Sequence, residues 1–239
     1  MELWTGFAVI CAYVIKGLCG FANTLVLSTM LSFGTSNINI TPVELLVGYP
    51  SNIIVSWKER KSLNWKIWLP LVILVIAGSI PGAVILKSGN VTVIKIIFGF
   101  VVAGIGLELF LRERQNRRKK YSSAVMLSIG LLSGLLCGLF GIGALLAAYM
   151  GQKTESSKEF RGNLCIVFLA ENTFRIILYS VTGILTAQMY KRALLLIPLM
   201  ILGLLAGIGL SKVLDEKKIK TGVIILLILS GLSLIITNF

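Results

Sequence analysis

Apolar residues run along most of the chain in long stretches, and short polar or charged links separate them. A bilayer core about 30 Å thick takes roughly 20 apolar residues per helix, so such stretches predict transmembrane helices. Eight stretches are found, at residues 3–33, 42–57, 67–86, 91–111, 121–150, 160–182, 193–211 and 221–236. The pattern predicts an all-α integral membrane protein with about eight transmembrane segments and no separate soluble domain.

Two of these stretches are longer than one upright helix needs. Residues 3–33 would reach about 47 Å as a straight helix, well beyond the bilayer core, and residues 121–150 pose the same problem. Each contains a glycine motif, GLCGFAN at 17–23 and GLFGIGA at 138–144. Glycine weakens helices, and unwound backbone at membrane depth is tolerated only where it is buried or lines a cavity. We expect each segment to break at its motif, as a discontinuous helix or a re-entrant hairpin, with motif glycines lining a cavity; close helix packing is the alternative role.

The two motifs belong to a longer internal duplication. Their glycines recur at a constant spacing, an asparagine in the following segment recurs at nearly the same spacing, and the third segments open with PLVIL and PLMIL. The matched residues are Gly17 and Gly138, Gly20 and Gly141, and Asn52 and Asn172. Duplication is common in secondary transporters, whose substrate sites lie near the midplane between the repeats. We predict a first repeat over 1–111, a basic link over 112–120 and a second repeat over 121–239; chance similarity between apolar segments is the alternative.

The composition supports a membrane protein, because 56% of the residues are hydrophobic and 14% are charged, against about 25% charged in ordinary soluble domains. The net charge of +13 would suit nucleic acid, but the basic residues fall in short links, where they set orientation and meet anionic lipid. The link RERQNRRKK at 112–120 is the densest basic cluster. If it is cytoplasmic and the chain makes eight simple crossings, both termini are cytoplasmic.

The chain offers few groups for metal binding or catalysis. It has no histidine, its four cysteines lie in apolar segments without a CxxC spacing, and its single aspartate, Asp215, lies in a charged link. The usual metal ligands and catalytic pairs are therefore missing, and we predict no cofactor. No GxxxxGK[ST] phosphate loop is present, so the chain itself is not predicted to hydrolyse a nucleotide.

The motifs in their order carry a family resemblance. The GLCGFAN and GLFGIGA cores, the stretch KERKSLNWKIWLPLVILVIAGSIPGAVI and the stretch EFRGNLCIVFLAENTFRIILYSVTGILT together resemble the TauE/SafE sulfite exporter family, also called the toluene sulfonate uptake permease family, over about residues 5–236. The resemblance implies an inner-membrane transporter with seven or eight spans that moves small sulfur-containing or organic anions such as sulfite, sulfonates or sulfoacetate. Members commonly carry a denser glycine cluster followed by a proline, whereas here Phe21, Ala22, Asn23 and Thr24 stand in that region and no proline follows until Pro42.

Cations inside the predicted segments are the first candidates for anion binding. Lys16 lies directly before the first motif, and such a residue faces a cavity or a partner unless it snorkels to the headgroups. Arg175 lies within the sixth segment, and its planar fork suits oxyanions. Glu171 precedes it by one helical turn, so the two residues also suit a mutually neutralising pair. In the functional alternative, Glu171 positions Arg175 and their balance shifts when a substrate or proton arrives.

Polar residues near the motifs complete the predicted site. Asn52 and Asn172 either support the interrupted backbone or bind substrate oxygens, and Asn23 and Thr24 add donors at a half-helix N-terminus. Glu44 lies near the edge of its segment, where plain solvation is expected rather than a proton-coupling role. The predicted substrate-binding residues are Lys16, Gly17, Gly20, Asn23, Thr24, Asn52, Gly138, Gly141, Gly143, Asn172 and Arg175, with Glu171 as a coupling or structural ion-pair residue.

The resulting hypothesis is a multi-pass inner-membrane secondary transporter of small anions, with its site between the two repeats. Its expected partners are a small anionic substrate, the lipid bilayer and a proton or sodium ion as coupling ion, and no nucleic acid. A passive channel, a structural membrane partner and a membrane-embedded enzyme are the alternatives. Transported species, direction of transport and oligomeric state stay open.

Overall fold

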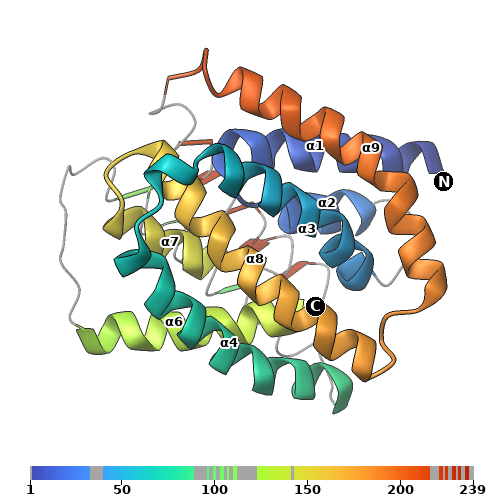
Figure 1. Ribbon diagram of the computed structural model, residues 1–239, viewed down its shortest axis with the longest axis horizontal. Coiled ribbons are helices and arrows are strands. Elements are labelled where there is room, and N and C mark those ends of the chain that lie inside the picture. Colours follow the sequence, from blue (N-terminus) through green and yellow to red (C-terminus); the bar gives the residue numbers. More distant parts are fainter. Residues whose placement is uncertain are drawn as a thin grey trace.

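The computed structural model describes residues 2–32, 40–88, 123–140 and 143–215, with single positions in 96–111 and 221–236. Within these residues all regular structure is helical, as the sequence predicts (Figure 1). In chain order the elements are α1 (Glu2–Cys19), α2 (Asn23–Ser32), α3 (Ile40–Lys58), the 3-10 turn η1 (Arg60–Ser62), α4 (Trp65–Ser88), α6 (Ser123–Phe140), α7 (Ala144–Lys153), α8 (Ser157–Val181) and α9 (Ala187–Leu210). The basic link over 112–120 lies outside the described residues.

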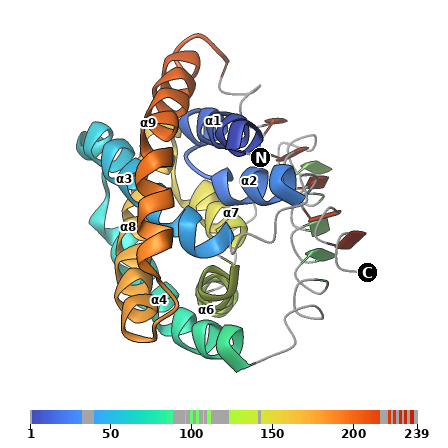
Figure 2. The same cartoon turned by 90° about the vertical axis from the view of Figure 1, so that its right-hand side faces the viewer.

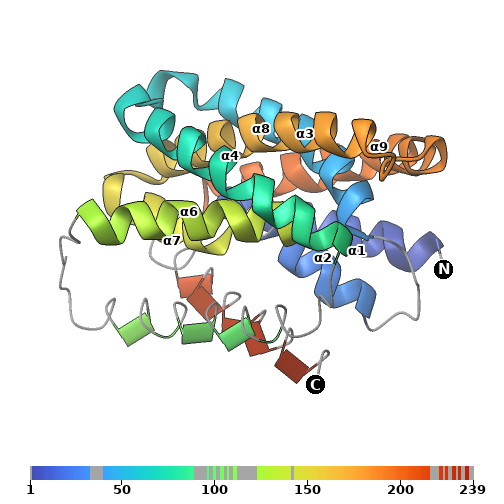
Figure 3. The same cartoon turned by 90° about the horizontal axis from the view of Figure 1, so that it is seen from below.

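The labelled helices lie in two layers. One layer holds α3, α4, α8 and α9, and the other holds α1, α2, α6 and α7 (Figures 2 and 3). The most extensive contacts are those of α1 with α9, α4 with α6, and α3 with α8. Each of these pairs joins a helix from residues 1–111 to a helix from residues 121–239, so the two parts of the chain interlock.

The first overlong segment is broken and turns back on itself. Between α1 and α2, Gly20 has a φ of 85° and Ala22 a φ of 72°, which is the left-handed conformation that ends a right-handed helix. Near the far ends of the two helices, the Trp4 indole Nε1 donates a hydrogen bond of 3.0 Å to the Met30 carbonyl oxygen. The break therefore occurs within the predicted motif, and α1 and α2 form a helical hairpin.

The second overlong segment is also broken at its motif. α6 ends at Phe140, and α7 begins directly after Gly143 and packs on α6. Gly138 lies in the last turn of α6, and Gly141 lies outside the described residues. The helical structure of this segment is thus interrupted at Gly143, within the predicted motif.

Two helices, Ser157–Val181 and Ala187–Leu210, are long and apolar enough to cross a bilayer, and shorter apolar stretches run over Leu3–Cys19 and Trp65–Pro81. α9 leaves several large apolar side chains exposed, among them Leu194, Leu195 and Leu202. Exposed apolar surface of this extent marks a face that a lipid or protein environment covers.

The predicted segments are matched in part. α3, α4, α8 and α9 overlap the second, third, sixth and seventh apolar stretches. In the stretches at 91–111 and 221–236 the described positions are helical, and Gly99 and Gly231 bring the two stretches into backbone contact. The eight-segment layout and its division into two repeats stay predictions.

Glycines let these helix pairs approach until their backbones touch. A Cβ atom built on Gly17 of α1 would lie 2.5 Å from the Leu204 carbonyl oxygen of α9, and one on Gly207 of α9 would overlap the Val14 carbonyl oxygen. A Cβ atom on Gly78 of α4 would likewise overlap the backbone of α6. The first glycine of the GLCGFAN motif therefore packs helix against helix, the alternative role considered for the motif glycines.

The Gly207→Ala substitution is expected to destabilise the protein. The added methyl group must push α1 away from α9, and overpacking of this kind costs roughly 1–3 kcal/mol. Gly209→Ala is the matched control on the same helix, because nothing lies within 4 Å of a Cβ atom there. Unfolding in detergent micelles, followed by tryptophan fluorescence, should show a lower free energy of unfolding for Gly207→Ala and an unchanged one for Gly209→Ala. Equal effects of the two substitutions would contradict the packing role.

Candidate functional site

One helix, α8, holds the first break in place. The Arg161 Nη1 atom donates a hydrogen bond of 3.3 Å to the Leu18 carbonyl oxygen, and the Cys165 Sγ atom donates one of 3.4 Å to the Gly20 carbonyl oxygen. Carbonyl groups in the last turn of a helix have no intrahelical partner, so these bonds satisfy groups that α1 leaves open. The Arg161 side chain also forms an ion pair of 3.3 Å with Glu59 at the end of α3. A side chain at Gly20 would collide with Arg161, since its Cβ atom would lie 2.8 Å from Arg161 Cγ.

The same helix contacts the second break further along its length. The Arg175 Nη1 atom donates a hydrogen bond to the Cys137 carbonyl oxygen near the end of α6. At the start of α7, a Cβ atom on Gly143 would overlap the Phe168 ring. α8 therefore satisfies or covers the backbone at both interruptions, and glycine is required at Gly20 and Gly143 because α8 lies so close.

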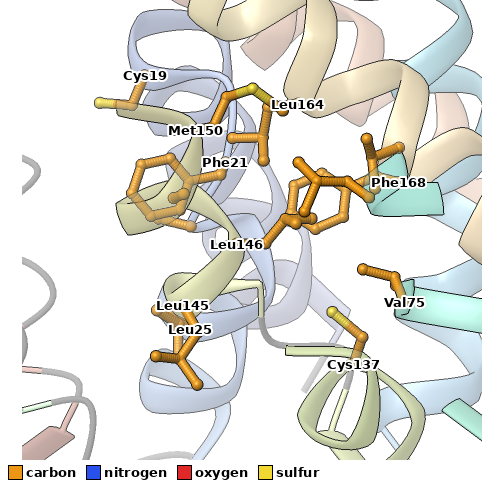
Figure 4. Close-up of a cluster of buried hydrophobic side chains, with 14 residues drawn as sticks. Cys19, Phe21, Leu25, Val75, Cys137, Leu145, Leu146, Met150, Leu164 and Phe168 are labelled. Carbon is orange, nitrogen blue, oxygen red and sulfur yellow. The ribbon is translucent and has the colours of Figure 1, made fainter. Parts of the chain in front are cut away.

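The two breaks meet around one apolar cluster. Figure 4 shows side chains from the first hairpin, from α6 and α7, and from α4 and α8 gathered about the same centre. The labelled members are Cys19, Phe21, Leu25, Val75, Cys137, Leu145, Leu146, Met150, Leu164 and Phe168. Side chains next to the two interrupted segments are therefore buried together inside the protein, and three of the four cysteines are buried there or nearby, with free thiols.

Beside this cluster lie four buried charged side chains. Lys16 comes from α1, Glu44 from α3, and Glu171 and Arg175 from α8, and they are only 2%, 4%, 2% and 2% exposed. Glu44 interacts electrostatically with both Lys16 and Arg175. Formal charges of two cations and two carboxylates balance, which is the condition under which charges are tolerated away from water.

Glu171 and Arg175 form the ion pair that their spacing predicts. The Arg175 Nε atom lies 3.7 Å from the Glu171 Oε1 atom, and the guanidinium group stands 5.8 Å from the centre of the Tyr179 ring. The Arg175 Nη1 atom also donates a hydrogen bond to the Cys137 carbonyl oxygen. The guanidinium group therefore contacts both the Glu171 carboxylate and the end of α6. The geometry therefore gives Arg175 a definite structural partner, as the ion-pair alternative expects.

Lys16 has no comparable partner. Among the described residues, no carboxylate lies within 4.0 Å of its ammonium group, which stands 5.8 Å from the centre of the Tyr13 ring. The snorkelling alternative is wrong, because the side chain is buried inside the helix layers rather than extended to the surface. Among the described residues, Cys165 and Glu44 interact electrostatically with it. A buried ammonium group without a close carboxylate is suited to accept an anion.

The sequence-based expectation for Glu44 is wrong. We expected this residue to be solvated near the edge of its segment, but it is buried and its Oε1 atom accepts a hydrogen bond from the Asn23 amide at the start of α2. Thr24, next in α2, also interacts with the carboxylate. The α1–α2 hairpin is the physical reason, because α2 folds over this part of α3 and covers it.

Tyr13 is a residue of this site that the sequence analysis did not identify. Its hydroxyl group is buried and has no hydrogen-bond partner among the described residues. A Cβ atom built on Gly48 would lie 3.2 Å from Glu44 Oε1, 3.5 Å from Tyr13 Oη and 3.7 Å from Asn23 Nδ2. Three polar groups from α1, α2 and α3 thus converge on a spot that Gly48 leaves open. The only sequence signal was that Tyr13 precedes Lys16 by three residues, which puts both on one face of α1.

Asn52 and Asn172 are both buried, on the helices α3 and α8 that pack together. Support of an interrupted backbone was one expectation for them, but within the described residues neither side chain makes a hydrogen bond to either break. The Asn52 Oδ1 atom has no hydrogen-bond partner in that part of the chain. The structure thus leaves at least one buried amide oxygen available at the helix interface.

A family described as sulfite exporter TauE/SafE has a model that matches residues 5–234 of the chain. Neither a curated protein nor a solved structure gives a significant match. The match spans both breaks and includes Lys16, Glu44, Glu171 and Arg175.

Proposed function

Because this chain belongs to the sulfite exporter TauE/SafE family, a family of multi-pass membrane transporters rather than enzymes, we propose that it is a secondary transporter of small oxyanions. Sulfite and organic sulfonates are the substrate classes that the family description and the site chemistry favour together. The substrate would bind between the two interlocked parts of the chain, where the breaks meet. Small organic carboxylates are the nearest competing class.

The observation that carries this proposal is that Lys16 is buried without a close carboxylate among the described residues. A bound anion can therefore supply the direct contact to this buried ammonium group that Glu44 does not make. Lys16 also lies one turn before the first break, since the Gly20 N–H donates a 2.6 Å hydrogen bond to its carbonyl oxygen. An anion there would meet the ammonium group and the N-terminal end of α2, where the helix dipole attracts negative charge.

The other predicted site residues have different roles in this proposal: substrate contact, helix packing or positioning. Asn23, Thr24, Asn52 and Asn172 are placed to offer polar contacts to a substrate, while Gly20 and Gly143 keep the breaks close to α8. Gly17 acts through helix packing. Arg175 is a positioning residue that holds the end of α6, with Glu171 as its ion-pair partner. Gly138 and Gly141 stay predictions from the motif alone.

The direct test is transport by purified protein in liposomes. Labelled sulfite, methanesulfonate and a small carboxylate would be offered under imposed gradients, with protein-free liposomes and liposomes holding an unrelated membrane protein as controls. The proposal expects saturable uptake of at least one sulfur oxyanion, with competition by unlabelled substrate. No movement of any anion, or unitary currents in planar bilayers typical of a pore, would contradict a carrier.

A further inference from the structure

We propose that Glu44 is the proton-binding residue that couples anion transport to proton movement. The inference rests on the proposed function, because it assigns the coupling ion of that same site. It starts from a carboxylate that is 4% exposed and contacts the hairpin through the Asn23 amide.

The surroundings of Glu44 show why its charge matters to an incoming anion. On α1 it faces Lys16 and Tyr13, on α2 Asn23 and Thr24, and on α8 Arg175 and Glu171. From α9, which also packs on α3, the buried contributions are apolar: Ala193, Met200 and Leu204. Since Glu171 is paired with Arg175, Glu44 is the carboxylate left to balance Lys16.

Charge balance then dictates what happens when an anion arrives. With Glu44 ionised, the four buried charged groups sum to zero, and a bound monovalent anion would leave one uncompensated negative charge in a buried site. Uptake of one proton by the Glu44 carboxylate restores neutrality. Binding of the anion and binding of the proton therefore favour each other, as thermodynamic linkage requires.

The proposed proton site is the Glu44 carboxylate and the polar groups around it. The Glu44 Oε1 atom, the Tyr13 hydroxyl group and the Asn23 amide surround the spot left open by Gly48, and the Tyr13 hydroxyl group has no other hydrogen-bond partner among the described residues. Protonation gives the Glu44 carboxyl group a donor, and the Tyr13 hydroxyl group lies next to the same spot. In each cycle one proton from the aqueous phase would bind the carboxylate with the anion and leave with it on the other side.

The test uses methanesulfonate, whose single negative charge does not change between pH 5 and pH 8. The full-length protein in liposomes is held at zero membrane potential with valinomycin and equal potassium, and labelled methanesulfonate is offered with and without an inward proton gradient. For the wild type we expect about tenfold accumulation per pH unit, because one coupled proton contributes about 1.4 kcal/mol per unit. A pH-sensitive dye should report one proton per anion.

Glu44→Gln separates coupling from transport, because glutamine keeps the acceptor for the Asn23 amide but carries no titratable proton. This variant should lose gradient-driven accumulation while keeping exchange of labelled for unlabelled methanesulfonate, and Glu155→Gln, at an exposed position, should behave as the wild type. Gradient-driven accumulation by Glu44→Gln, or wild-type exchange without proton coupling, would overturn the inference alone. Loss of exchange in a monodisperse Glu44→Gln protein would also overturn it, since the carboxylate would then serve translocation itself. No wild-type exchange of methanesulfonate would count against the proposed function and, with it, the inference.

Discussion

Replacement of Lys16 by methionine is expected to lower the rate of sulfur-oxyanion transport at limiting substrate by roughly 10- to 150-fold. A hydrogen bond to a charged group contributes about 1.5–3 kcal/mol, and that free energy converts to this range of rates. Methionine preserves the length of the side chain but cannot neutralise an anion. Initial rates of labelled uptake at several substrate concentrations measure the effect.

Stability separates a binding role of Lys16 from a structural one. Removing the Lys16 ammonium group removes a desolvation cost but leaves Glu44 without its balancing cation, so Lys16→Met should lose less stability than Arg175→Met, which breaks a direct ion pair. Lys191→Met, at an exposed position on α9, controls for the loss of one positive charge. Unchanged uptake by Lys16→Met, with normal folding, would refute the assignment of Lys16 to the anion site.

Arg175→Met is expected to destabilise the protein by about 3–5 kcal/mol, because it leaves Glu171 as an uncompensated buried charge. It also removes the donor to the Cys137 carbonyl oxygen at the end of α6. Equilibrium unfolding in mixed detergent micelles, followed by tryptophan fluorescence, gives the free energy of unfolding. The effect on stability should exceed that of any other single substitution proposed above.

The double variant Arg175→Met/Glu171→Gln tests whether the pair explains that loss. If the ion pair dominates, the double variant recovers a large part of the stability, because no charge is left unbalanced. Glu171→Gln alone should destabilise less than Arg175→Met, since glutamine still accepts hydrogen bonds. Additive losses in the double variant would show that Arg175 acts through the α6 terminus rather than through Glu171.

The features that were predictable from the sequence are those set by local spacing. Segment length and glycine content located both breaks, since neither segment could be one upright helix. The Glu171–Arg175 pair follows from a one-turn spacing on a helix. The all-helical class follows from long apolar stretches, whose backbone groups must be satisfied within each segment.

The features that were missed depend on contacts between distant segments. Glu44 lies two residues inside its apolar stretch, and position within a stretch says nothing about a hairpin that folds over it. Arg161 lies at the edge of an apolar stretch, and nothing in the sequence sets it apart from other basic residues there. In the structure it caps the end of α1 at Leu18, which is 143 residues earlier in the chain. Gly17 was assigned to a cavity because its segment is overlong, whereas its contact with α9 depends on which helices pair.

The departure from the family motif also has a local consequence. Where relatives carry a denser glycine cluster, this chain has Ala22 with a φ of 72°, a conformation that costs a non-glycine residue about 1–2 kcal/mol. The surrounding contacts must hold this residue in place, because its own preference opposes the turn. The first break therefore depends on its packing against α8 and α7 as well as on the left-handed conformation of Gly20.

α8 touches the first break through Arg161 and Cys165 and the second through Phe168 and Arg175. These contacts are spread over about 21 Å of helix, at roughly 1.5 Å per residue. Because α8 is a continuous helix that contacts both breaks, the two breaks should move together. A tilt of α8 that separates it from one break must also displace the other. Opening to one side of the membrane and closing to the other would then be one concerted movement of α8 with both breaks.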